Sequence, residues 1–198
     1  MSAAIEAIRS RRVVAVLRRV ADPASVVHAL REEGLGVFEI TLDSQDALET
    51  IAALRDDADL VVLAGTVRTA DEVRAALEAG AQACVSPTLA REVVEACREA
   101  GVPAIPGAMT PTEIETAWRL GAEMVKVFPA VRLGPEFISD LRGPLEGIPL
   151  LATGGVDATN ARDFLRAGAA AVGIGSALVG APDVREAARK LVRSARDA

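Results

Sequence analysis

A lysine stands inside an apolar segment in the second half of the chain. Lys126 lies within Glu-Met-Val-Lys-Val-Phe-Pro, and Lys190 is the only other lysine of the sequence. A buried ammonium group is unstable unless it is paired or loses its proton. Lysine can lose that proton and attack a carbonyl carbon as a neutral amine, which arginine cannot do. Lys126 is therefore a candidate nucleophile for a Schiff base. The competing interpretation is a lysine that snorkels from a strand edge or pairs structurally with a carboxylate.

A glutamate occupies a second apolar segment, Val-Phe-Glu-Ile-Thr-Leu. Alternation along a strand places Glu39 and Thr41 on the face opposite Phe38. If the apolar face packs against helices, Glu39 and Thr41 point into the core of the sheet. A carboxylate there can move protons during imine formation and carbon–carbon cleavage at Lys126. The alternative is a structural ion pair of Glu39 with Lys126 or Arg18.

Two glycine-rich turns suggest a site for an anion. Thr153, Gly154 and Gly155 follow one apolar segment, and Gly175 and Ser176 follow the next. Glycine lets backbone N–H groups approach a ligand closely, and the second turn would open a short helix whose N-terminus favours negative charge. We expect a phosphate to bind here. The simpler explanation is that these glycines only form tight turns.

The segments that carry these residues belong to a pattern that repeats along the chain. Short apolar stretches recur eight times, roughly 20 to 25 residues apart, with an amphipathic stretch after each. The apolar stretches are 13–17, 37–41, 60–64, 83–86, 103–106, 124–128, 149–153 and 170–174. Helices are expected between them, for example at 23–33, 71–78, 91–99 and 160–167, with another that opens at Thr110-Pro111 and closes at Gly121. Almost every strand ends in a polar residue or a glycine.

Strands that alternate with helices indicate parallel strands joined by right-handed crossovers. Eight such units predict a single (β/α)₈ TIM barrel over residues 1–198, with its functional groups at the C-terminal ends of the strands. Residues 2–9 would form an extra helix across the bottom of the barrel. A doubly wound open sheet is the alternative, but the segment after the first strand carries no glycine-rich turn of the GxGxxG type.

Composition excludes several classes of function. The 51% of hydrophobic residues is typical of a globular domain. The formal net charge of −6 argues against a nucleic-acid surface. No apolar run reaches the roughly 18 residues of a membrane span, and the N-terminus is too polar for a signal peptide. His28 is the only histidine, and Cys84 and Cys97 form no ligand cluster. We therefore expect a cytoplasmic protein with no metal and no cofactor, and with reduced cysteines.

The motifs together resemble one family. The matching segments are VVAVLR, GVFEITL, AGTV, CVSPTL, PAIPGAMTPTE, MVKVFPA, LATGGV and VGIGSALV. They run in order through nearly the whole chain, which resembles the 2-keto-3-deoxy-6-phosphogluconate (KDPG) and 4-hydroxy-2-oxoglutarate aldolases, class I lyases that produce pyruvate. The resemblance implies cleavage of KDPG to pyruvate and glyceraldehyde 3-phosphate, with Lys126 as the Schiff-base lysine and Glu39 as acid and base through a water.

The resemblance also implies the remaining site residues and a homotrimer. Arg18 and Thr66 would lie near the pyruvate carboxylate, Thr153 would line the pyruvyl pocket, and Pro87 would be a further substrate-binding residue. The phosphate would be held by Gly154, Gly155, Gly175 and Ser176.

One departure from the family pattern concerns the turn after Glu39. Many members carry an arginine there that binds a substrate carboxylate, whereas this chain has Asp43. Arg18, at the end of the first strand, could supply that charge instead. A second departure is Leu63, where a glycine is common. Neither departure touches Lys126 or Glu39, but both leave the substrate preference open.

Several other functions compete with KDPG cleavage. The same chemistry could act on 2-keto-3-deoxy-6-phosphogalactonate (KDPGal), which differs in one stereocentre, or on 4-hydroxy-2-oxoglutarate, which has no phosphate. A phosphate-binding barrel isomerase or decarboxylase without a covalent intermediate would not explain Lys126 beside Glu39. A barrel used for binding alone would not explain the polar strand ends. A metal-dependent aldolase would need a cluster of carboxylates and histidine.

Overall fold

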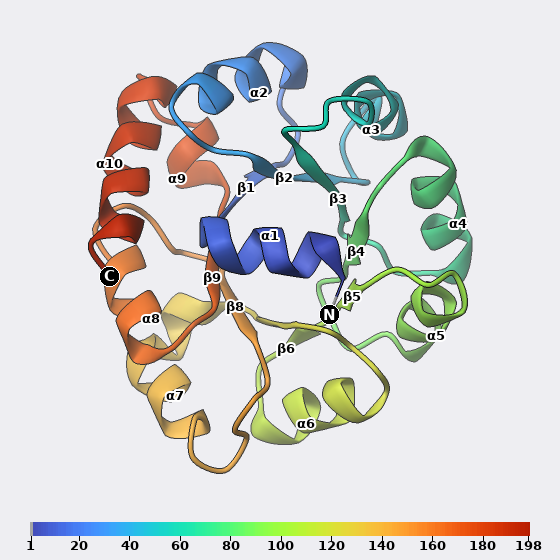
Figure 1. The fold of residues 1–198 in the computed structure, drawn as a ribbon, viewed down its shortest axis with the longest axis vertical. Helices are drawn as coiled ribbons and strands as arrows, with labels where there is room; N and C mark the ends of the chain where they lie inside the picture. Colours follow the sequence, from blue (N-terminus) through green and yellow to red (C-terminus); the bar gives the residue numbers. More distant parts are fainter. Residues whose placement is uncertain (1) are drawn as a thin grey trace.

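The computed structural model describes residues 2–198 as a ring of parallel strands surrounded by helices (Figure 1). The strands are β1 Val13–Leu17, β2 Val37–Thr41, β3 Val61–Gly65, β4 Ala83–Val85, β5 Ala104–Ile105, β6 Gly107–Ala108, β7 Val125–Val127, β8 Leu150–Thr153 and β9 Ala171–Ile174. They form one sheet in the order β5-β4-β3-β2-β1-β9-β8-β7-β6, and all neighbouring pairs are parallel. The sheet curls into a nearly closed barrel, which confirms the predicted TIM-barrel fold.

The fifth strand of the barrel differs from the prediction. An unbroken strand over 103–106 was expected, but the chain forms two short strands, β5 and β6, on either side of Pro106. β5 pairs with β4, and β6 pairs with β7. Proline has no N–H group for a strand ladder, so Pro106 interrupts the pairing, although its carbonyl still accepts a hydrogen bond from Lys126 N. The barrel thus keeps eight strand positions, with the fifth divided.

Helices surround the strands, and one of them lies across an end of the barrel. They are α1 Ala3–Arg11, α2 Pro23–Glu32, α3 Ala47–Leu54, α4 Ala70–Ala79, α5 Arg91–Glu99, α6 Pro111–Arg119, α7 Gly134–Leu141, α8 Ala161–Ala167, α9 Ser176–Val179 and α10 Val184–Arg196, with a 3₁₀ helix at Ala130–Arg132. Asp22 caps α2 by accepting a hydrogen bond from Ser25 N, and Thr110 forms a capping box with Glu113 at α6. Over residues 2–198, no helix has both the length and the apolar character needed to cross a bilayer.

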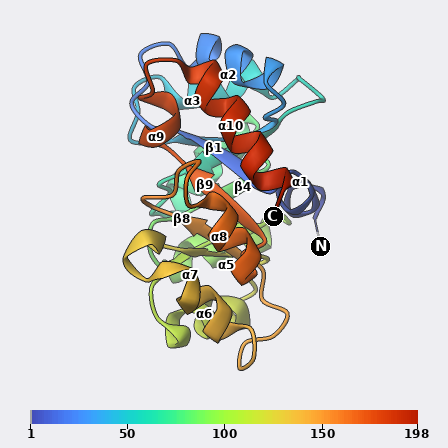
Figure 2. The same cartoon turned by 90° about the vertical axis from the view of Figure 1, so that its left-hand side faces the viewer.

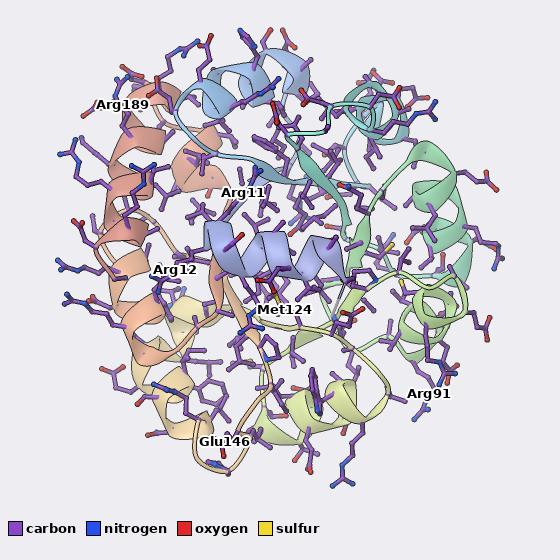
Figure 3. The ribbon with its side chains drawn as sticks, viewed as in Figure 1. Arg11, Arg12, Arg91, Met124, Glu146 and Arg189 are labelled. Atoms are coloured by element: carbon purple, nitrogen blue, oxygen red, sulfur yellow. The ribbon has the colours of Figure 1, made fainter. Side chains whose placement is uncertain are left out.

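One end of the barrel is closed by α1. Ser2 caps this helix, and its Ile5 and Ile8 pack among the inward-facing side chains of the strands, including Leu63 and Met124. Figures 1 and 2 show α1 lying across the end of the barrel from which β1 starts, and Figure 3 labels Met124 just below this helix in the view. The extra helix predicted at the bottom is therefore confirmed. Figure 2 shows α9 at the opposite end of the barrel.

Candidate active site

Strand alternation brings Lys126 and Glu39 into the barrel. Phe38 and Val125 pack in the outer apolar layer between the sheet and the helices, so the adjacent Glu39 and Lys126 face inward. Only 8% of the Lys126 side chain and 1% of the Glu39 side chain are exposed, and Lys126 Nζ lies 3.5 Å from Glu39 Oε1. The structure thus joins the two residues that the sequence singled out for chemistry.

The carboxylate of Glu39 occupies a space that a side chain at the neighbouring Gly65 would fill. Gly65 on the neighbouring strand has no side chain, and a Cβ there would overlap the carboxylate of Glu39. Among the described residues, the second carboxylate oxygen, Oε2, is buried and has no hydrogen-bond partner. The aromatic ring of Phe128 is also near the lysine, with its centroid 5.4 Å from Nζ. Glu39 Oε2 is therefore available to a substrate or a water beside the amine.

A cavity of about 1190 Å³ opens above this pair at the C-terminal ends of the strands. All ten residues that the sequence predicted for the site line it: Arg18, Glu39, Thr66, Pro87, Lys126, Thr153, Gly154, Gly155, Gly175 and Ser176. They come from strands and loops spread over most of the chain, and the barrel gathers them because all its strands end on the same side.

The glycine turns present free backbone donors to the cavity. Gly154 and Gly155 have φ angles of 95° and 78°, a region that favours glycine. The N–H groups of Gly154, Gly155 and Gly175 make no hydrogen bond to any other described residue. Nearby, the hydroxyl of Thr153 is buried and also lacks a partner among residues 2–198. This end of the cavity can therefore bind an anion through backbone and hydroxyl donors.

Positive side chains stand at the mouth of the cavity. Arg18, predicted to bind a carboxylate, has 55% of its side chain exposed and donates hydrogen bonds from Nε and Nη2 to Asp43 Oδ2, at 2.9 and 2.7 Å. Arg19 Nη2 lies 3.2 Å from the same oxygen. Burial raises the pKa of Asp43, but hydrogen bonds from Arg18 and Thr41 and the charges of both arginines outweigh it. The net pKa is below the ordinary value, so the pair with Arg18 is ionised at neutral pH.

Sequence reasoning did not identify every residue of this cavity. Arg19, Arg68, Phe128 and Asp157 also line it. Phe128 and Asp157 follow strands β7 and β8 closely, so their proximity to the strand ends was an available signal. The directions of Arg19 and Arg68 depend on the conformations of loops, for which no comparable sequence pattern exists.

Comparison with known proteins places this barrel and cavity in a family. A family model described as KDPG and KHG aldolase matches residues 4–193. The chain is 39% identical over 164 residues to the 2-dehydro-3-deoxy-phosphogluconate aldolase of Treponema pallidum, with 81% of this chain and 78% of that protein covered. It is 31% identical to the 2-dehydro-3-deoxy-6-phosphogalactonate aldolase of Escherichia coli, over 94% of this chain and 90% of that protein.

Solved structures agree with the sequence relatives. The crystal structure of the 2-keto-3-deoxy-6-phosphogluconate aldolase of Zymomonas mobilis with 3-phosphoglycerate superposes with a TM-score of 0.83 at 28% identity, covering 96% of this chain and 94% of that chain. Family model, relatives and fold all agree over most of the chain. The chain therefore belongs to the KDPG and KHG aldolase family and is an aldolase, a lyase that acts on carbon–carbon bonds.

Proposed function

We propose that this protein cleaves KDPG to pyruvate and glyceraldehyde 3-phosphate through a Schiff base on Lys126. The observation that carries this proposal is the buried amine of Lys126, 3.5 Å from the Glu39 carboxylate at the base of the cavity. A neutral lysine amine in such a site is a nucleophile towards ketones, and the carboxylate beside it is an acid–base partner.

The reaction uses these two groups in sequence. The Lys126 amine attacks the C2 ketone, and loss of water gives a protonated imine. Glu39, directly or through a water, takes the proton of the C4 hydroxyl, the C3–C4 bond breaks, and its electron pair moves into the imine to give an enamine. The aldehyde then leaves. Protonation of the enamine at C3 and hydrolysis by water release pyruvate and restore the free lysine.

The two ends of the cavity suit the two ends of this substrate. Arg18, Thr66, Pro87 and Thr153 would surround the pyruvyl part. The free N–H groups of Gly154, Gly155 and Gly175, with the Ser176 hydroxyl, would hold the phosphate. The Zymomonas mobilis relative was crystallised with a phosphorylated acid, 3-phosphoglycerate, which supports a phosphorylated substrate for the present chain.

A second candidate is KDPGal, the C4 epimer, because the Escherichia coli relative of that specificity aligns over 94% of this chain. Pyruvate release should be measured with purified protein on KDPG, KDPGal and 4-hydroxy-2-oxoglutarate. We expect the largest kcat/KM with KDPG. Faster cleavage of KDPGal would transfer the proposal to the epimer, and equal turnover of 4-hydroxy-2-oxoglutarate would overturn the phosphate site. No release from any of the three would overturn the proposed reaction.

We also propose that the protein acts as a homotrimer in the cytoplasm. Met109 and Phe128 are exposed and directly follow Ala108 and Val127, which are paired between β6 and β7, and Val131 is exposed close by in the chain. An assembly would cover these apolar side chains. Light scattering coupled to gel filtration tests the trimer, and a monomer at micromolar concentration would contradict it.

A further inference from the structure

The turn after β2 is tied to the end of β1 by side-chain contacts. Asp43 Oδ2 accepts hydrogen bonds from Arg18 Nε and Nη2 at 2.9 and 2.7 Å and lies 3.2 Å from Arg19 Nη2. Ser44 Oγ accepts a hydrogen bond of 2.8 Å from Arg19 N and lies 2.9 Å from Thr41 Oγ1. The turn therefore fixes both the backbone and the guanidinium groups of the Arg18–Arg19 segment.

The three charged side chains, Arg18, Arg19 and Asp43, have different positions relative to the cavity. Arg18 and Arg19 line the cavity, whereas Asp43 does not. The Asp43 side chain is 21% exposed, against 55% and 72% for those of Arg18 and Arg19, so it is the most buried of the three. The two bonds to Asp43 fix the plane of the Arg18 guanidinium and leave its Nη1 without a partner in residues 2–198. Asp43 can therefore reach a substrate only through the arginines.

Two opposite effects of Asp43 on an anionic substrate must be compared. Its negative charge weakens the attraction of the arginines for an anion. In the solvent-exposed mouth, one unit charge about 7 Å away changes binding by about threefold. Its hydrogen bonds to Arg18 and its ion pair with Arg19 hold two flexible side chains that would otherwise repel each other. Freeing one such side chain costs up to about tenfold in binding. Orientation is the larger of the two effects.

We propose that Asp43 is a positioning residue that holds Arg18, with Arg19 beside it, so that Arg18 receives the carboxylate of the 2-keto acid. This inference rests on the proposed function. The turn after β2 then contributes no positive charge of its own and instead directs the charge supplied by the end of β1. The ion triad has a net charge of +1, which suits a single carboxylate.

The test is Asp43→Asn, which keeps the shape of the side chain and removes its charge. We expect KM for the keto-acid substrate to rise about three- to tenfold, with kcat changed by less than about twofold, because Asp43 orients the substrate-binding Arg18 and touches no reacting atom. Asp46→Asn is the matched control. Asp46 lies on the same turn, is exposed, and makes no side-chain capping bond, so both constants should stay at wild-type values.

A double-mutant cycle adds a second measurement. If Asp43 acts through Arg18, Asp43→Asn should add less than about twofold to KM in an Arg18→Ala background. The same rise in both backgrounds, or an unchanged or lower KM in folded Asp43→Asn, would overturn the proposal. Borohydride trapping of pyruvate on wild-type Lys126 separates the two claims. If no pyruvate is trapped on wild-type Lys126, the proposed function is wrong. If pyruvate is trapped but Asp43→Asn has the wild-type KM, only the positioning role of Asp43 is wrong.

Discussion

Lys126 Nζ and Glu39 Oε1 lie 3.5 Å apart, although 87 positions separate the two residues in the chain. The lysine comes from β7 and the glutamate from β2, so their contact spans the interior of the barrel. Both side chains are nearly inaccessible to solvent except through the cavity. A proton can therefore pass between amine, carboxylate and substrate without release to bulk water.

Replacing Glu39 with glutamine keeps the size of the side chain and removes its ability to accept a proton. Acid–base groups contribute about 10² to 10⁴ in rate, and we expect a loss of kcat in that range. Imine formation with pyruvate should continue, more slowly. Steady-state kinetics combined with borohydride trapping measure both effects. Wild-type turnover in Glu39→Gln would show that the glutamate has only a structural role.

Gly65→Ala should damage catalysis by displacing Glu39. The new Cβ would overlap the Glu39 carboxylate, which must then move away from Lys126. Misplacement of a catalytic group by about 1 Å can cost 10²-fold in rate, and we expect a loss of roughly ten- to a hundredfold in kcat. Gly143→Ala is the control, because nothing lies within 4 Å of a Cβ at that position. Equal activities of the two variants would contradict this role of Gly65.

Ser176→Ala tests the phosphate end of the cavity. If the hydroxyl donates a hydrogen bond to the phosphate, its removal should lower kcat/KM for the phosphorylated substrate by about tenfold. For the dephosphorylated substrate, Ser176→Ala should have the same low kcat/KM as the wild type. Ser139→Ala, on the exposed surface of α7, serves as the control. An equal loss on both substrate forms would show that Ser176 does not recognise phosphate.

Asp43 should make stability depend on pH in a defined direction. Its pKa in the folded protein lies below the ordinary value. Its ionised form therefore stabilises the fold above the unfolded-state pKa of about 3.9, and this contribution is lost as the pH falls through the lower, folded-state pKa. Urea unfolding of the wild type and of Asp43→Asn should differ by a constant amount above pH 5 and converge in more acidic solution. A difference that grows as the pH falls would contradict the ion pair.

Much of the site could be predicted because strand alternation and strand ends are local features. The alternation around Phe38 and Val125 gave the inward direction of Glu39 and Lys126, and parallel strands place all their C-terminal ends together. The glycine turns at Gly154 and Gly175 could be located in the same way. These inferences needed only the order of residues along short segments.

Other features depend on contacts that the sequence order does not specify. The pairing of Arg18 with Asp43 joins residues 25 positions apart, and Arg19 adopts a left-handed φ of 53° that arginine rarely favours. No local pattern predicts either. The break of the fifth strand at Pro106 is different, since a proline within a strand segment removes a donor from the ladder and so indicates such a break.

The central claim is that Lys126 forms the Schiff base, and reductive trapping tests it most directly. The protein should be treated with pyruvate and borohydride, digested, and mapped by mass spectrometry. Because Lys190 is the only other lysine, it serves as an internal control in the same sample. We predict one reduced pyruvyl adduct on Lys126, none on Lys190, and neither adduct nor aldol cleavage in folded Lys126→Arg. Cleavage by Lys126→Arg, or a wild-type enzyme that turns over substrate without an adduct on Lys126, would contradict the account.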